Sequence, residues 1–156
     1  MIFDKKKIEI SIIGSGSQAN KIFEICKRIT KIKKITRYHY KTKENFTNNF
    51  SKIFFSNCIF ICSPTYTHYK YLKKLKKYSG YIFLEKPGVS NIKEIQYLQN
   101  KFDNRKIFIN YNFQFSNLYK ILNKKINKKK FGKIIKVDIC STNWLIHKKN
   151  YNNWRF

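Results

Sequence analysis

The sequence predicts an α/β fold built on an open, mostly parallel sheet, and three observations support this. Short runs of β-branched and aromatic residues alternate with segments whose apolar residues recur at helical spacing. The chain has 156 residues, enough for one core, and 42% of them are hydrophobic and 17% aromatic. Strands that alternate with helices pack as parallel strands joined by right-handed crossovers.

The first strand and the first helix are joined by a glycine turn. Residues 8–13 read Ile-Glu-Ile-Ser-Ile-Ile, a β-branched run that predicts a buried strand. The turn that follows leads into a helix expected over residues 20–31, where Ile22, Ile25 and Cys26 recur at helical spacing.

Further strands and helices then alternate. Strands are expected over residues 35–40, 53–63, 81–84 and 107–115. Helices are expected over residues 67–78, up to residue 101 after a cap at Ser90 or Asn91, and over residues 117–128. The stretch before the strand at 53–63 is short, so we expect the helix and strand of that region to be reduced.

The chain is strongly basic, with 34 Lys and Arg against 8 Asp and Glu and a net charge of +26. Of the basic residues 30 are Lys, and they are spread along the whole chain. Lys, Ile and Asn share A/T-rich codons, so codon drift explains this composition better than selection for nucleic-acid binding, for which Arg is preferred. The positive field still attracts anionic ligands.

The cysteines and the apolar runs indicate a cytoplasmic protein. Cys26, Cys58, Cys62 and Cys140 form no Cys-x-x-Cys pair, and we expect reduced thiols and no metal site. No apolar run reaches the roughly 18 residues of a membrane span. The first residues do not read as a signal peptide.

The turn after the first strand carries the pattern Gly14-x-Gly16-x-x-Ala19. In this place the first glycine allows a tight turn, the second lets a pyrophosphate approach the backbone, and Ala19 permits close helix–strand packing. The helix N-terminus offers free N–H groups to the phosphates. We therefore expect residues Gly14, Ser15, Gly16, Ser17, Gln18 and Ala19 to hold a dinucleotide.

The second expected strand lacks the acidic residue that binds the ribose hydroxyls of NAD. Arg37 and His39 stand there, followed by Lys41 and Lys43, while Glu44 is the nearest carboxylate. These cations can neutralise a 2′-phosphate, which slightly favours NADP over NAD. The alternative is that they are solvated charges in a Lys-rich chain.

Two more motifs follow the ends of expected strands. Ser63-Pro64-Thr65-x-x-His68 follows one strand, and Glu85-Lys86-Pro87 follows the next. Open α/β sheets bind their ligands at these carboxyl ends. A lysine in a cleft can donate to a substrate hydroxyl and take part in proton transfer.

With these motifs the sequence resembles the N-terminal half of the Gfo/Idh/MocA family (glucose–fructose oxidoreductase, inositol dehydrogenase and rhizopine catabolism proteins). The resemblance runs through nearly the whole chain and is carried by Gly14–Ala19, Ile61–His68, Tyr81–Pro87, Asn110–Phe115 and Phe131–Ile134. It implies a Rossmann domain that binds NAD or NADP and exchanges a hydride with a sugar, sugar-nucleotide or cyclitol carbon. It also implies that Lys86 lies beside the nicotinamide and orients the reacting hydroxyl.

The resemblance further assigns residues to the cofactor cleft. It implies that the cleft is lined by Ser63, Pro64, Thr65, His68, Glu85, Lys86, Pro87 and Asn112. Gln114 departs from the family, which often has Arg there. Residues 151–156 look similar to variants from surface-glycan pathways.

The resemblance also predicts the domain organisation. Residues 1–130 are expected to form the Rossmann domain and residues 131–156 the start of a C-terminal substrate domain, of which only the first strand, about residues 134–143, is present. An unpaired strand of this kind favours a homo-oligomer. Two alternatives to an oxidoreductase stay open, a cofactor-binding remnant without turnover and, less favoured, a nucleic-acid-binding module.

Overall fold

The computed structural model describes residues 7–103 and 106–127 and, beyond them, residues 132, 133, 135, 136, 138 and 140. The chain forms two compact units, Met1–Asn112 and Phe113–Phe156. The expected domain boundary between residues 130 and 131 stays a prediction.

The first unit contains a five-stranded sheet in which every neighbouring pair of strands is parallel. The strand order is β2-β1-β3-β4-β5. The strands are β1 (Ile8–Ile13), β2 (Ile32–Tyr38), β3 (Cys58–Ile61), β4 (Tyr81–Leu84) and β5 (Ile107–Ile109). This sheet confirms the predicted α/β fold.

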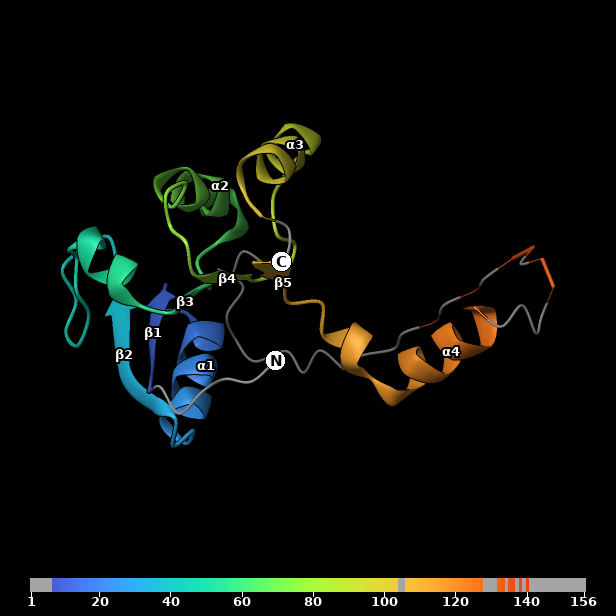
Figure 1. Ribbon diagram of the computed structural model, residues 1–156, viewed down its shortest axis with the longest axis horizontal. Coiled ribbons are helices and arrows are strands. Elements are labelled where there is room, and N and C mark those ends of the chain that lie inside the picture. The colour runs from blue at the N-terminus through green and yellow to red at the C-terminus, as the bar shows by residue number, and fades with distance from the viewer. Residues whose placement is uncertain are drawn as a thin grey trace, which may run out of the picture. The chain divides into compact units, whose positions relative to one another are not determined.

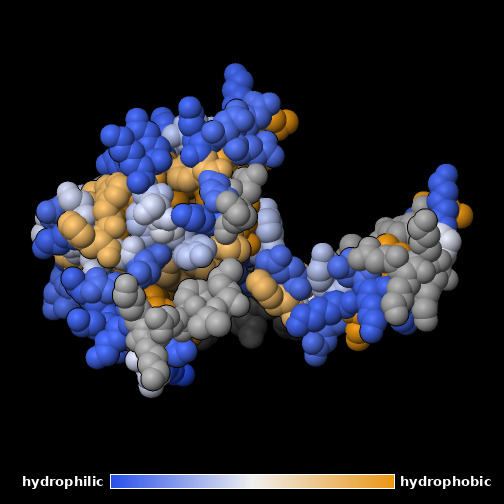
Figure 2. Space-filling model, in the orientation of Figure 1, coloured by the Kyte–Doolittle hydropathy of each residue, from blue (hydrophilic) through white to orange (hydrophobic). Residues whose placement is uncertain are grey.

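Helices cover the two faces of the sheet, as Figure 1 shows. Helix α1 (Ser17–Lys27) lies on one face, and α2 (Thr65–Lys74) and α3 (Ile92–Lys101) lie on the other. A 3-10 helix, η1 (Phe50–Phe55), precedes β3. Figure 2 shows hydrophilic side chains over the outer side of α2 and α3, which carry the exposed lysines Lys70, Lys73, Lys74, Lys93 and Lys101.

The larger core cluster lies between the sheet and helices α2 and α3. Strand residues such as Ile61 and Leu84 meet Leu72 and Leu98 there, and their side chains are almost fully removed from water. Burial of each such side chain stabilises the fold by about 1.5–3 kcal/mol. This layer therefore fixes the central strands relative to helices α2 and α3.

A smaller core cluster lies under α1 and is built from Ile10, Ile12, Ala19 and Cys26. On the same face of the sheet the rings of Phe60, Phe83 and Phe108 are stacked across three strands. Their centroids are 4.7 Å apart for Phe60 and Phe83 and 5.2 Å apart for Phe83 and Phe108.

Several expected boundaries are corrected. The strand expected over residues 53–63 is wrong in its first half, because η1 buries Ile53 and leaves Phe55 80% exposed, so that only Cys58–Ile61 pair in the sheet. The strand expected over 107–115 ends at Ile109. Helix α1 begins at Ser17, three residues earlier than expected.

The region after β2 is reduced, as expected. Among the described residues 39–49, the one contact of sheet type is an isolated parallel bridge between Tyr38 and Thr47. The connection from β2 to β3, which lies on the other side of β1, therefore contains η1 as its one described helix. The reversal of strand order falls between β1 and β3.

In the second unit, α4 (Asn117–Asn127) confirms the helix expected there. The 3-10 helix η2 (Asn112–Phe115) precedes it and begins at the last residue of the first unit. The strand expected over 134–143 and the motif at 151–156 lie outside the described residues, apart from isolated positions. No helix in the described part of the chain is long and apolar enough to cross a membrane.

Candidate functional site

The five strands end level with one another. Ile13 is in register with Tyr38 and with Ile61, Ile61 is in register with Leu84, and Leu84 with Ile109. The residues that follow these strand ends are His39, Gly14, Cys62, Glu85 and Asn110. The three motifs singled out in the sequence therefore meet at one edge of the sheet, on neighbouring strands spaced about 4.8 Å apart.

The glycine turn has two different requirements. Gly14 adopts φ +116°, and a β-carbon there would lie 2.9 Å from the carbonyl carbon and oxygen of Cys62. Gly16 adopts φ −75°, and a β-carbon there would meet nothing within 4 Å. Gly14 is needed for the fold of the turn, whereas Gly16 keeps space beside the backbone free for a ligand.

The N-terminus of α1 fits an anionic group. Gly16 is its N-cap in an extended conformation, the helix has no side-chain cap, and its first turn contains no acidic residue. The first N–H groups of a helix have no partner within the helix, and the helix dipole favours negative charge there. Ala19 is completely buried, which brings α1 close to the sheet. Ser15, Ser17 and Gln18 lie in this exposed or partly exposed turn.

The turn after β3 is held by its own hydroxyl groups. Thr67 Oγ1 lies 2.7 Å from Ser63 Oγ and donates to the Pro64 carbonyl, also at 2.7 Å. Pro64 is the N-cap of α2, and Thr65 is its first residue. A second helix N-terminus thus lies at the same edge as that of α1.

His68 is completely buried, and both of its ring nitrogens face main-chain carbonyls. Nδ1 lies 3.0 Å from the Gly88 oxygen and Nε2 lies 2.7 Å from the Ser63 oxygen. The ring therefore joins the turn after β3 to the loop after β4.

The loop after β4 carries Lys86, whose side chain is exposed. The preceding Glu85 is partly buried, and its Oε1 accepts a hydrogen bond from Asn110 Nδ2 at 2.7 Å. The Lys86–Pro87 peptide bond is cis. Gly88 is buried against the side chain of Ile109, to whose Cδ1 a β-carbon at Gly88 would come within 2.6 Å.

The end of β2 carries a stacked arginine. The Arg37 guanidinium carbon lies 4.0 Å from the ring centroid of Phe46 and 4.6 Å from that of Phe23, and its Nη2 donates to Asn20 Oδ1. Burial lowers the pKa of Arg37, which the charge of Glu24 partly opposes. Its Nε is buried with no hydrogen-bond partner.

The other cations of this region are more open. His39 is partly exposed, and its Nδ1 lies 3.1 Å from the Lys41 carbonyl oxygen. The Lys41 and Lys43 ammonium groups lie over the rings of Tyr40 and Phe46 at 5.6 and 5.3 Å.

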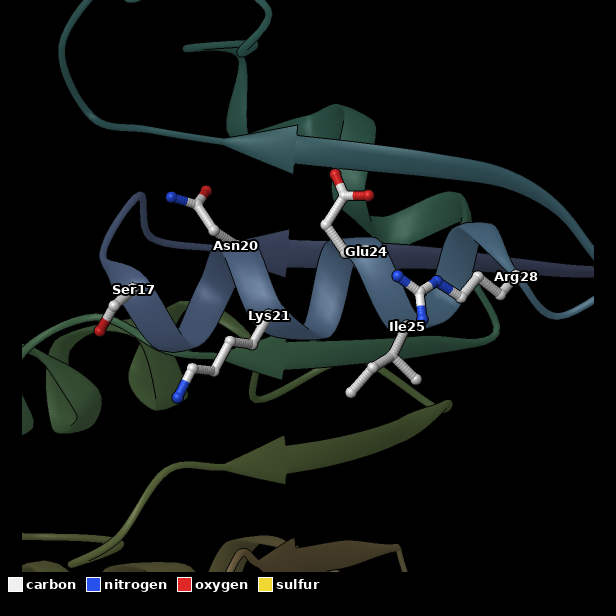
Figure 3. A pocket seen from close by; sticks show the side chains of 6 residues that line it. All are labelled: Ser17, Asn20, Lys21, Glu24, Ile25 and Arg28. Atoms are coloured by element: carbon white, nitrogen blue, oxygen red, sulfur yellow. The ribbon is translucent and has the colours of Figure 1, made fainter.

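A shallow open groove lies along the outward side of α1, shown in Figure 3. It is lined by Ser17, Asn20, Lys21, Glu24, Ile25 and Arg28. Only Ser17 belongs to the glycine turn, so this groove is not the place where the motifs converge.

Removal from water disfavours the thiolate form of the cysteines in the first unit. Burial raises the pKa of the Cys58 and Cys62 thiols to about 12 and also raises the pKa of Cys26. All are free thiols, as is the exposed Cys140. No group of three or more potential metal ligands occurs among the described residues.

Sequence reasoning missed three features of the site. It did not assign Asn110, the ring pair Phe23 and Phe46 around Arg37, or the Gly88 carbonyl bound by His68. These pairings join residues at least nine positions apart, so no local pattern shows them. Asn112 is exposed at the end of the first unit, and its expected cofactor contact stays a prediction.

An open parallel sheet with a Gly-x-Gly-x-x-Ala turn after its first strand, at a helix N-terminus free of acids, defines a dinucleotide-binding domain of the Rossmann type. The chain belongs to the Gfo/Idh/MocA family. The model of that family, described as an oxidoreductase family with an NAD-binding Rossmann fold, matches residues 7–113.

Solved structures share the fold. Scyllo-inositol dehydrogenase from Lactobacillus casei, with bound NAD(H) and scyllo-inositol, superposes with a TM-score of 0.66 at 20% identity, over 81% of this chain and 43% of that one. The WlbA dehydrogenase from Bordetella pertussis, in complex with NADH and UDP-GlcNAcA, gives 0.68 at 14% identity, over 82% and 42%. Myo-inositol 2-dehydrogenase from Lactobacillus plantarum gives 0.66 at 17% identity, over 83% and 44%.

The chain thus spans less than half of the length of these structures. No curated protein sequence matches it significantly.

Proposed function

We propose that this chain is the cofactor-binding part of an NAD(P)-dependent oxidoreductase that acts on a hydroxyl or keto carbon of a sugar, sugar nucleotide or cyclitol. The observation that carries the proposal is the level edge of the sheet, which brings the Gly14–Ala19 turn, the Ser63–Thr65 turn and Lys86 onto three neighbouring strands. The ligands of the similar dehydrogenases, scyllo-inositol and UDP-GlcNAcA, support the substrate class.

In this proposal each motif has one task. The α1 N-terminus and the open side of Gly16 hold the pyrophosphate. The Ser63–Thr65 turn and the loop of Glu85 and Pro87 border the nicotinamide. The bound nicotinamide would accept or supply the hydride. Lys86, the proposed catalytic residue, donates a hydrogen bond to the reacting oxygen and, when neutral, takes its proton.

We further infer a preference for NADPH over NADH. His39 occupies the position directly after β2, and Lys41 and Lys43 follow within the same exposed turn. These cations can pair with a 2′-phosphate. Arg37 contributes positive charge to this region without a direct contact with the 2′-phosphate, since its guanidinium is already stacked on two rings and bound to Asn20.

The remaining proposals concern the setting of the protein. We place residues 1–130 in the cofactor domain and residues 131–156 at the start of a substrate domain. The free thiols fit a reducing compartment such as the cytoplasm. A homo-oligomer would form through the sheet of the substrate domain.

Thermal unfolding of the full chain with NADH, NADPH and inorganic pyrophosphate tests the cofactor proposal. A dinucleotide at one hundred times its dissociation constant adds about 2.7 kcal/mol of stability. We expect a larger shift with NADPH than with NADH, and one that persists at moderate salt. A shift equal to that of pyrophosphate, or none in a chain that unfolds cooperatively, contradicts a dinucleotide site.

The substrate class is tested by cofactor reduction. Scyllo-inositol and UDP-GlcNAcA are offered with NAD or NADP, and reduced nicotinamide is followed by absorbance. We expect any turnover to be lost in Lys86→Ala while cofactor affinity stays within a few-fold. Turnover that persists in Lys86→Ala would contradict the proposed catalytic role of Lys86.

A further inference from the structure

The loop that carries Lys86 is held at both of its ends by side chains from other elements. On one side, Asn110 at the end of β5 donates to the Glu85 carboxylate at 2.7 Å. On the other side, the buried ring of His68 on α2 binds the Gly88 carbonyl at 3.0 Å. Only Lys86 and Pro87 lie between these two attachments.

The two attachments differ in what they join. Asn110 fixes the start of the loop to the next strand, where its own N–H also donates to the Leu84 carbonyl at 2.8 Å. His68 fixes the end of the loop to the turn after β3, because its other nitrogen lies 2.7 Å from the Ser63 oxygen. The loop is thereby tied to both neighbouring strands.

The contacts of His68 with Gly88 and Ser63 require a hydrogen-bond donor in the His68 ring. The ring is completely buried, and both partners are carbonyl oxygens, which accept and cannot donate. A neutral imidazole has one N–H, so it donates to one carbonyl at a time, whereas the imidazolium donates to both. An apolar residue of similar size would leave the buried Gly88 carbonyl and the partly buried Ser63 carbonyl without this partner, which is costly.

We propose that His68 and Asn110 are positioning residues that hold the Lys86 ammonium group beside the bound nicotinamide. This inference rests on the proposed function, because it concerns the same dinucleotide site. It assigns His68 no direct cofactor contact, and it gives Asn110 a role that the sequence motifs did not indicate. Loss of either attachment frees the Lys86 loop without removing the glycine turn that holds the pyrophosphate.

Substitution of His68 by asparagine or glutamine tests its contacts with Gly88 and Ser63 one at a time. The amide nitrogen of His68→Asn reaches the place of Nδ1 and keeps the bond to Gly88. The amide nitrogen of His68→Gln reaches the place of Nε2 and keeps the bond to Ser63. The first variant retains the attachment of the Lys86 loop, and the second loses it.

The readout is the position of Lys86 itself, measured on the full chain by acetylation with acetic anhydride and mass spectrometry. NADH bound beside Lys86 should slow its acetylation, while the exposed Lys101 at the far end of α3 serves as the internal control. In His68→Gln, His68→Ala and Asn110→Ala we expect the protection of Lys86 to fall about fivefold, the effect of one hydrogen bond. His68→Asn should keep it.

Affinity for ADP-ribose provides the matched measurement, because this compound lacks the nicotinamide. We expect it to be unchanged in all four variants, and thermal unfolding without ligand shows that each is folded. Equal protection of Lys86 in the wild type and in every folded variant overturns the positioning role and leaves the proposed function standing. Failure of the wild type to bind ADP-ribose, NADH and NADPH overturns both.

Discussion

Gly14 lies directly against the main chain of Cys62, so that a β-carbon at Gly14 would come within 2.9 Å of the Cys62 carbonyl carbon and oxygen. The turn after β1 and the end of β3 are thus in contact through backbone atoms, which cannot move aside as a flexible side chain would. This contact makes the first glycine of the motif a requirement of folding.

Gly14→Ala should therefore destabilise the chain by about 2 kcal/mol or more, because it adds a backbone clash to a φ of +116° that alanine rarely adopts. Thermal unfolding without ligand measures the effect. An unchanged midpoint would show that the turn can relax around the methyl group.

Gly16→Val should impair dinucleotide binding and leave the stability of the fold nearly unchanged. The site of its side chain is open and α1 already starts there without a side-chain cap, so stability should change by less than about 1 kcal/mol. Dinucleotide binding, measured by calorimetry, should be lost because the side chain occupies the approach of the pyrophosphate. Gly16→Ala should be intermediate, and normal binding by the valine variant would contradict the phosphate site.

The cofactor preference can be tested with two matched pairs of lysines. Lys41 and Lys43 lie over aromatic rings after β2, and the α2 residues Lys73 and Lys74 lie over the rings of Tyr69 and Phe50. Replacing the first pair by alanine should lower NADPH affinity about tenfold and leave NADH affinity unchanged, since charge-assisted bonds to the 2′-phosphate are lost. The second pair controls for net charge, and an equal loss in both doubles would indicate general anion attraction.

The partly buried thiols of Cys58 and Cys62 predict a loss of stability at alkaline pH. Burial raises the pKa of Cys58 and Cys62 from 9.0 to about 12. Between these values the unfolded chain has released protons that the folded chain keeps, so rising pH favours unfolding. The thermal midpoint should fall from pH about 8 to about 11, and less steeply in a Cys58→Ala, Cys62→Ala double variant.

The exposed Cys140 is the control for this experiment, since Cys140→Ala should leave the pH slope unchanged. Burial also raises the pKa of Tyr71 and Tyr78 to about 12, so part of the slope should persist in the double variant. A slope identical in all three proteins would assign the whole effect to other groups.

The cap of α3 offers a test of local stability. Asn91 accepts a hydrogen bond from the Glu94 N–H at 3.1 Å, and the Glu94 carboxylate accepts one from the Ser90 N–H at 2.7 Å. Asn91→Ala should cost about 1 kcal/mol in unfolding free energy. Asn100→Ala, on the exposed side of the same helix, should cost nothing, and equal effects of the two would contradict the capping role.

Local patterns predicted most of the fold but extended two strands into the 3-10 helices η1 and η2. The strands at residues 8–13 and 81–84 were predicted at their observed bounds because turn residues end both runs. Residues 53–55 share the apolar composition of β3, yet η1 turns Ile53 inward and Phe55 outward. A continuous apolar run does not reveal its period, so the two arrangements cannot be separated in the sequence.

The site was predictable to the level of motifs and not of contacts. The edge position of Gly14 and Lys86 follows from the rule that ligands bind at the carboxyl ends of parallel strands. The bond from His68 to Gly88 joins residues twenty positions apart. The stacking of Arg37 between Phe23 and Phe46 depends on where α1 and the segment after β2 come to lie. Only the tertiary structure supplies that information.

Because the strands end level with one another, insertions and deletions within them should disturb the site. A deletion of one residue within β3 or β4 would draw the following motif back by about 3.3 Å and turn the strand's side chains to the opposite faces. A substitution at the same place leaves the spacing intact. The numbers of residues between motifs are therefore as much a part of the site as the motif residues themselves. Insertions should be tolerated in the exposed turn of residues 28–31, which carries no motif, rather than in the strands.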